Sequence, residues 1–310
     1  MKSILKNQYL EFNFILFPFW IGCFYILLNS LFPDYKYLLF FLFLFVFGET
    51  HFASTYLFYF DKRNHSWILK NYLKMIVFPI ILLAAFIFIG FNSIYLAVLI
   101  ISVASAFHVT RQSVGISRLY SNPKNSFYEY SIYFFSFLFI FIGFVRFVLN
   151  DLIDILNLPF NNLIFDKSYF YPLIFLGIII GLSNRDNYKK MFSTLCGILV
   201  YSPYVFLSNP FDAMVVGVGA HWCQYLALNY KIYFSKQTNY SYIVIIAFFI
   251  ILYSLLMTYF GFELYTLNDY SNLLVLIPLT GNMFHFYTDM YIWKFSDPHV
   301  RENIGKKIYT

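Results

Sequence analysis

The chain has 310 residues, of which 60% are hydrophobic, 24% aromatic and only 12% charged. About 25% of the residues of a soluble domain are charged, so this composition excludes an ordinary soluble protein and indicates one that lies in lipid. The net charge of +6 is better explained by membrane topology than by binding to nucleic acid. We therefore expect an all-α, polytopic integral membrane protein with lipid, and no nucleic acid, among its partners.

The first apolar run extends from about Tyr9 to Leu31 and follows the basic segment MKSILKNQ. Its apolar stretch is longer than that of a signal peptide and no A-x-A-like cleavage site follows, which predicts a retained transmembrane helix. The three cysteines, Cys23, Cys196 and Cys223, all fall within apolar runs. That placement predicts buried thiols rather than disulfides or a cysteine-based metal site.

A transmembrane helix needs about 20 predominantly apolar residues, and the chain holds about ten such candidates. They are Tyr9–Leu31, Lys36–Phe60, Leu69–Gly90, Ser93–Ser117, Tyr128–Leu149, Tyr169–Leu182, Met191–Leu207, Asp212–Phe234, Tyr242–Gly261 and Asn272–Phe295. No linker, repeat or low-complexity block marks a second domain, so we expect one transmembrane domain over residues 1–310. The polar, basic segment 296–310 is expected to be a cytoplasmic tail, and Asn150–Ser168 an outer loop or interfacial helix.

Basic residues are concentrated in the N-terminus, the even-numbered loops and the tail, whereas the odd-numbered loops carry mostly acidic residues. The cations are Lys2, Lys6, Lys62, Arg63, Lys70, Arg118, Lys124, Arg185, Lys189, Lys190, Lys231, Lys236, Lys294, Arg301, Lys306 and Lys307. Cytoplasmic loops of membrane proteins carry an excess of Lys and Arg. The pattern therefore predicts that both termini are cytoplasmic, which requires an even number of spans.

Four histidines lie in apolar runs, in the second, fourth, eighth and tenth predicted spans: His51, His108, His221 and His285. All four spans run from outside to inside in this topology. Each histidine lies about ten residues before the cytoplasmic loop, or about 15 Å, near the middle of a hydrocarbon core about 30 Å thick. One such histidine is more often an interhelical hydrogen-bonding residue. Four at a common depth predict a metal site, because neutral imidazole is a ligand for iron, copper and zinc.

The other two histidines, His65 and His299, lie in the polar segments DKRNHS and SDPHV. We expect both to be solvated rather than ligands.

Two carboxylates accompany the intramembrane histidines. Glu49 precedes His51 by two residues, and Asp289 follows His285 by four, which places this second pair on one helix face. A metal-bound histidine usually donates its other N–H to a carboxylate, carbonyl or water. Glu49 and Asp289 are thus expected to act as direct ligands or as partners that tune the ligands.

Three further polar residues follow histidines at helical spacing: Arg111 and Gln112 after His108, and Gln224 after His221. The two amides could orient imidazoles or bound water. A charged arginine is costly within lipid, so we expect Arg111 to pair with one of the two buried carboxylates. The alternative is that such a pair is purely structural.

The spacing of the histidines in the sequence excludes some kinds of metal site but does not identify the metal. The dense H-x-x-x-H and H-x-x-H-H clusters of membrane di-iron enzymes, H-E-x-x-H and cysteine-rich zinc patterns are all absent from the sequence. Four histidines with nearby carboxylates suit one non-haem iron, most simply Fe²⁺, with open positions for O₂ and substrate. Two metals, with Glu49 and Asp289 as additional ligands, or a bis-histidine haem are the alternatives.

Several spans with scattered intramembrane histidines, the His51–Phe52 pair and a final His285 followed by Asp289 resemble the bacterial Brp/Blh carotene dioxygenases. That resemblance implies an iron that splits the central double bond of β-carotene with O₂ to form retinal, in a bacterial inner membrane. The chain departs from the family in lacking H-G-A-x-D and H-x-x-x-H segments, and in the spacing of four rather than five residues between the last histidine and its acid.

These observations together predict an iron-dependent membrane oxygenase that acts on a hydrophobic substrate from the bilayer, with carotenoid cleavage as the specific hypothesis. One alternative is a two-metal lipid hydroxylase or desaturase. Another is a proton-coupled transporter, in which the buried histidines and charges form an ion path; the sequence shows no internal repeat and no broken helix pair to support it. A haem-binding structural subunit is a third.

Overall fold

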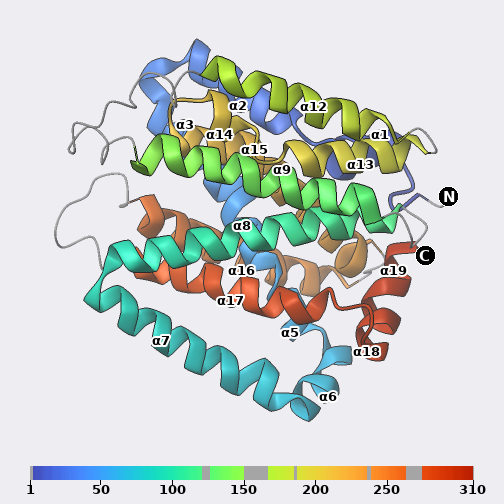
Figure 1. Ribbon diagram of the computed structural model, residues 1–310. Helices are drawn as coiled ribbons and strands as arrows, with labels where there is room; N and C mark the ends of the chain where they lie inside the picture. Colours follow the sequence, from blue (N-terminus) through green and yellow to red (C-terminus); the bar gives the residue numbers. More distant parts are fainter. Residues whose placement is uncertain are drawn as a thin grey trace. The chain divides into compact units, whose positions relative to one another are not determined.

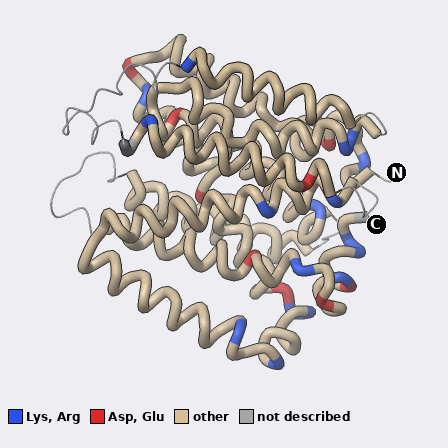
Figure 2. Tube along the Cα trace, viewed as in Figure 1, with Lys and Arg blue, Asp and Glu red and all other residues tan. Residues whose placement is uncertain are grey.

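The computed structural model describes residues 3–120, 126–149, 167–184, 187–235, 239–262 and 274–309. Every regular element within these ranges is a helix (Figure 1), which confirms the all-α class. The expected loop Asn150–Ser168, apart from its last residues, and the cations Lys124, Arg185 and Lys236 lie outside the described residues. Figure 2 shows long stretches of helix without charge, with most Lys and Arg residues towards helix ends.

Five of the described helices are long and apolar enough to cross a membrane: Pro33–Ser54, Leu73–Asn92, Ile94–Leu119, Ser126–Phe147 and Tyr240–Phe262. A sixth span results if the bent pair Gln8–Leu16 and Trp20–Leu31 counts as one. The structure is therefore that of a helical membrane protein. The count of ten spans stays a prediction.

Two of the expected spans that are not among these helices carry predicted metal ligands. Helix α15 (Pro210–Asn229) contains His221, and α17 (Leu276–Ile292), which has only 17 residues, contains His285. Both helices also hold buried amides, hydroxyls or carboxylates, such as Gln224 and Asp289. The polar residues that make these helices candidates for function thus also lower their hydropathy.

The chain divides into two compact units. Unit 1 comprises Met1, Asn7–Phe40 and Ala106–Gln224, and unit 2 comprises Lys2–Lys6, Phe41–Ser105 and Tyr225–Thr310. The divisions fall inside three helices: α3 (Lys36–Phe43), α8 (Ile94–Leu119) and α15. Each unit is described below on its own.

Unit 1 begins with a broken helix. Helices α1 (Gln8–Glu11) and η1 (Phe12–Leu16) are bent by 73° from α2 (Trp20–Leu31). Pro18 lies at the break; proline lacks the N–H that would continue the helical ladder and clashes with the preceding turn. The expectation of one continuous first span, and of no broken helix pair in the chain, was therefore wrong.

The rest of unit 1 is built from helices whose small residues allow close packing. Gly177 lies against Ile198 and Gly181 against Leu195, with no room for a Cβ at either glycine. The helices are α9 (Ser126–Phe144), η5 (Val145–Leu149), η6 (Lys167–Phe170), α12 (Tyr171–Leu182), α13 (Tyr188–Leu199) and α14 (Pro203–Phe206). The seventh expected span is divided between α13 and α14, where Pro203 begins a new helix.

Two of the cysteines, Cys196 and Cys223, are buried as expected, but Cys23 is exposed on α2. A position within an apolar run does not distinguish a residue that faces other helices from one that lies on the outside of its helix.

Unit 1 also buries an ion pair. Lys189 Nζ lies 3.1 Å from Glu11 Oε2, and Tyr120 Oη donates to Glu11 Oε1 at 2.7 Å. All three side chains are buried. This network ties the N-terminal α1 to α13 and to the end of α8.

Unit 2 contains an interrupted helix that carries His51. A π-helix, η3 (Leu44–Glu49), leads into α4 (Thr50–Ser54), and a turn at Thr55 and Tyr56 precedes α5 (Leu57–Phe60). Around it are α6 (Lys62–Lys70), η4 (Leu73–Val77), α7 (Phe78–Asn92), η7 (Tyr230–Phe234), α16 (Tyr240–Phe262) and α17. Phe52, Phe86, Leu276 and Phe286 are among the buried residues of its apolar core.

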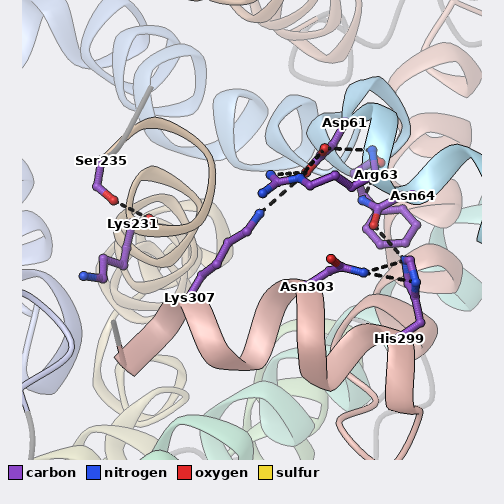
Figure 3. A network of polar contacts seen from close by, with 9 residues as sticks. Asp61, Arg63, Asn64, Lys231, Ser235, His299, Asn303 and Lys307 are labelled. Carbon is purple, nitrogen blue, oxygen red and sulfur yellow. Dashed lines mark hydrogen bonds and ion pairs between the residues drawn. The ribbon is translucent and has the colours of Figure 1, made fainter. Parts of the chain in front are cut away.

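The tail of unit 2 is structured: α18 (Pro298–Val300), η9 (Arg301–Gly305) and α19 (Lys306–Tyr309) follow one another. His299 was expected to be solvated, but it is half-buried, and its ring stacks on Trp67 with centroids 5.3 Å apart. Its Nε2 lies 2.9 Å from Asn64 Oδ1, and Asn303 Nδ2 lies 3.1 Å from its Nδ1 (Figure 3). Because the Asn64 amide N–H₂ already donates to the Phe58 carbonyl, His299 Nε2 must be the donor.

Charged groups reinforce the attachment of the tail. Arg63 donates hydrogen bonds to Asp61, and Lys307 Nζ lies 3.6 Å from the same carboxylate (Figure 3). Burial alone would raise the pKa of Asp61, but the bonds from Arg63 outweigh it and hold that pKa below its usual value. Burial and the nearby Arg63 charge lower the pKa of Lys307 to about 8.

The attachment of the tail should weaken in acid because of His299. Burial lowers the pKa of His299, against the opposing effect of Asp297 and Asp61, so the free tail takes up a proton more readily than the bound one. The stabilisation is complete above the ordinary histidine pKa of about 6.5 and declines as the pH falls below that value. Trp67 fluorescence and limited proteolysis of the tail between pH 8 and 5 measure the change. His299→Gln should abolish this dependence and His65→Gln should retain it; an unaltered profile in His299→Gln would refute the assignment.

Candidate metal centre

Unit 2 brings together His51 of α4 with His285 and Asp289 of α17. The imidazole centroids of His51 and His285 are 4.4 Å apart, and His285 Nε2 lies 3.7 Å from Asp289 Oδ2, one helical turn further on. The three residues are 1%, 1% and 5% exposed. Two histidines and one carboxylate thus converge in the interior of this unit.

A chain of hydrogen bonds fixes the tautomer of His285. When Asp289 is ionised, as a metal-bound carboxylate is, Tyr225 Oη donates to Asp289 Oδ1 at 2.7 Å and has no proton left for Thr55 Oγ1, which lies 2.9 Å away. Thr55 must therefore donate to Tyr225, and it can then only accept from His285 Nδ1, at 2.5 Å. The proton of the neutral imidazole lies on Nδ1.

The consequence is that His285 Nε2 carries a lone pair, as a metal ligand must. Two ligand atoms that each lie about 2.1 Å from a tetrahedral ion are about 3.4 Å apart. The observed 3.7 Å between Nε2 and Asp289 Oδ2 is close to this value and beyond hydrogen-bonding distance. His285 Nε2 and Asp289 Oδ2 are therefore spaced as two ligands of one transition-metal ion would be.

The interruption of the His51 helix makes this network possible. Thr55 lies in the turn between α4 and α5, where its hydroxyl reaches both Tyr225 and His285. The preceding residue, Ser54, donates to the His51 carbonyl at 2.7 Å and accepts from Asn229 Nδ2 at 2.8 Å. Side chains from the end of α15 thus hold the polypeptide that directly follows His51.

Unit 1 holds the other two predicted ligands. His108 of α8 and His221 of α15 have ring centroids 5.2 Å apart, with the rings nearly perpendicular at 88°. His221 is 1% exposed, and His108 is half-buried. The four histidines thus form two pairs in different units, and the sharing of one ion by all four stays a prediction.

The predicted auxiliary residues of unit 1 have varied surroundings. Gln224 Nε2 donates to the Ile15 carbonyl at 2.7 Å. Both amide atoms of Gln112 are buried and make no hydrogen bond among the described residues. Arg111 is exposed, and its guanidinium lies 5.7 Å from the centre of the Phe107 ring. Its expected pairing with a carboxylate of unit 2 stays a prediction.

Glu49 lies on a different side of its helix from His51. Residues two apart in an α-helix point about 200° from each other, and the Glu49 carboxyl interacts electrostatically with Tyr56 and Tyr253. It is 3% exposed, and its Oε2 makes no hydrogen bond among the described residues.

Sequence reasoning did not identify Thr55, Tyr225, Ser54 and Asn229 as parts of the site. A signal was present for two of them, because Tyr225 and Asn229 continue the helix that carries His221 at four-residue spacing. Thr55 gave no such signal, since its role depends on a break in the helix.

Comparisons of the chain with protein-family models, curated proteins and solved structures give no match. The candidate site is therefore interpreted from its own chemistry.

Disrupting the hydrogen-bond chain should weaken metal binding without removing a ligand. Thr55→Val and Tyr225→Phe each delete one hydroxyl between His285 Nδ1 and Asp289, so that the tautomer is no longer fixed. Loss of a partner of a ligand typically lowers metal affinity by about 10–100-fold, which titration of purified protein with Fe²⁺ or Zn²⁺ would measure. Tyr59→Phe, which removes the hydroxyl of a half-buried tyrosine that donates to the Met75 carbonyl, is the control. Equal affinity in all three variants would show that the chain does not orient a ligand.

Proposed function

We propose that this chain is an integral membrane oxygenase that uses a histidine-bound iron to oxidise a hydrophobic substrate taken from the bilayer. The observation that carries the proposal is the 3.7 Å spacing of His285 Nε2 and Asp289 Oδ2 in unit 2, with the His51 ring packed against His285 and the Thr55–Tyr225–Asp289 chain beside them. Two histidines and one carboxylate form the ligand set of many non-haem Fe(II) oxygenases.

The proposed ligands are His51, His108, His221 and His285, with Asp289 as a further ligand or as a partner that orients His285. The common depth of the four histidines in the sequence supports a shared ion. Bound Fe²⁺ would supply the ability to activate O₂. The chain itself would hold the ligands, exclude water through its aromatic surroundings and position the substrate.

A carotenoid is the specific substrate hypothesis, with cleavage of β-carotene to retinal as the reaction. It rests on the resemblance of the His51, His108, His221 and His285–Asp289 positions to the Brp/Blh carotene dioxygenases. The charge pattern of the loops supports a chain with both termini in the cytoplasm, and the same resemblance supports a bacterial inner membrane.

Two observations favour alternatives. The ring contacts pair His51 with His285 and His108 with His221, and two such pairs could supply ligands for two metals, as in a lipid hydroxylase or desaturase. The broken helix at Pro18 is a feature of ion-coupled transporters, whose sites use discontinuous helices.

Metal analysis tests the ligand assignment and separates these functions. Purified wild-type protein should hold one iron per chain, and His51→Ala, His221→Ala and His285→Ala should each lose most of it, because each removes a ligand. His65→Ala, a change in the polar segment DKRNHS, should leave the iron content as in wild type. Two metals per chain, with the His221 and His285 variants each losing only one, would favour the two-metal enzyme. Proton-coupled uptake in vesicles that survives chelation would favour transport.

The substrate hypothesis has its own test. Cells that accumulate β-carotene should lose colour when they express the wild-type chain and keep it when they express His285→Ala. The difference arises because cleavage at the centre of the polyene destroys its visible absorption. Retained colour with an iron-loaded wild-type protein would reject carotene cleavage and leave the metal site intact.

A further inference from the structure

A second polar cluster lies in unit 2, beside the candidate metal ligands. Glu49 Oε2 and Asn282 Oδ1 are buried acceptors that make no hydrogen bond among the described residues. In a hydrocarbon surrounding, an acceptor without a partner costs about 1–3 kcal/mol or more. Two of them within one helix group indicate that something that donates a hydrogen bond belongs there.

The register of the helices places these two acceptors at a similar height, and Tyr253 of α16 lies near both. Glu49 acts on Tyr253 electrostatically, and the Tyr253 hydroxyl lies against Gly281, next to Asn282. The α4–α5 segment and α17 run parallel. The His51 ring contacts the His285 ring, and further along both segments the Tyr59 hydroxyl contacts the Thr288 hydroxyl. Glu49 precedes His51 by two residues and Asn282 precedes His285 by three. With a rise of about 1.5 Å per residue, they lie about 3 Å and about 4.5 Å before the imidazoles.

Helix α16 provides the wall of this cluster. Tyr253 points its hydroxyl at Gly281, the residue before Asn282, so closely that a Cβ there would lie 2.5 Å from Oη. Tyr253 packs on Tyr56, and Tyr56 stacks on Phe284 with centroids 5.2 Å apart and planes 10° from parallel. A flat aromatic surface thus borders the acceptors.

The cluster is one helix away from lipid. The opposite side of α16 carries exposed apolar side chains, such as Phe248, Leu252 and Leu255, as expected for a face that contacts the bilayer. A ligand that arrives from the membrane would be mostly apolar. Its polar end meets the acceptor oxygens of Glu49 and Asn282 and the Tyr253 hydroxyl, so it must both donate and accept. A hydroxyl does both, whereas an ester or ether only accepts.

We propose that Glu49, Asn282 and Tyr253 form a subsite that binds the hydroxyl end of a membrane-dissolved alcohol, next to the metal ligands. The inference rests on the proposed oxidation of a hydrophobic substrate and adds its class. The hydroxyl would be held about one helical turn from His285. Because β-carotene has no hydroxyl, an alcohol substrate would replace carotene cleavage as the specific reaction.

Retinol and retinyl acetate test the proposal, because they share one polyene and differ in whether the terminal oxygen carries a proton. Their fluorescence reports binding to the protein in detergent or nanodiscs. Wild type should bind retinol at least tenfold more tightly than the acetate, since a site built to hydrogen-bond a hydroxyl rejects an analogue that lacks it.

The variants separate hydrogen bonding from shape. Asn282→Leu and Glu49→Leu should each lower retinol affinity towards that of the acetate while leaving the acetate unchanged. Thr258→Val is the matched control: it removes another buried hydroxyl of α16 that makes no hydrogen bond among the described residues, and it should keep the preference. Both leucine variants should unfold no more easily than wild type without ligand, because replacing an unsatisfied polar group by an apolar one is nearly neutral or stabilising.

Equal binding of retinol and its acetate by wild type, or a preference that both leucine variants retain, would overturn the subsite. Iron content measured on the same preparations keeps the two proposals apart. Normal iron without a hydroxyl preference refutes the subsite alone, and a hydroxyl preference without iron refutes the oxygenase alone.

Discussion

The structure depends on one constraint: a polar group inside a hydrocarbon layer has no water to bond to, so the protein must supply its partner. Unit 2 meets this constraint with a directed chain that passes from His285 through Thr55 and Tyr225 to Asp289. Each donor in the chain has one acceptor, and such chains reinforce one another in a medium of low polarity. When Asp289 is ionised, this chain determines both the orientation and the proton position of the imidazole.

The same constraint explains which features the sequence could predict. Apolar runs and their spacing predicted an all-helical membrane protein, because lipid accepts little else. The juxtaposition of His51 with His285, and of His108 with His221, agrees with their common predicted depth. Depth follows from counting residues along a helix, so a sequence can reveal it without knowledge of the fold.

Features that depend on local backbone geometry could not be predicted in this way. The turn at Thr55, the π-helix before it and the break at Pro18 all lie within segments that the sequence predicts to be single continuous spans. Pro18 gave a signal, since proline interrupts helices, but the turn at Thr55 has no proline or glycine. The partners of His299 were also hidden, because stacking on Trp67 brings together residues more than 200 positions apart and no local pattern encodes such a contact.

The π-helix η3 has a consequence for how this protein can vary. It covers the six residues Leu44–Glu49 and ends two residues before His51, and π-turns accommodate one more residue than an α-turn. A π-turn takes up its extra residue locally, so deleting one residue of this segment would return it to α-helical winding and leave the orientation of His51 unchanged. A deletion within the α-helical Lys36–Phe43 would instead rotate all that follows by about 100°. Homologous chains should therefore differ in length by one residue at Leu44–Glu49 more readily than at Lys36–Phe43.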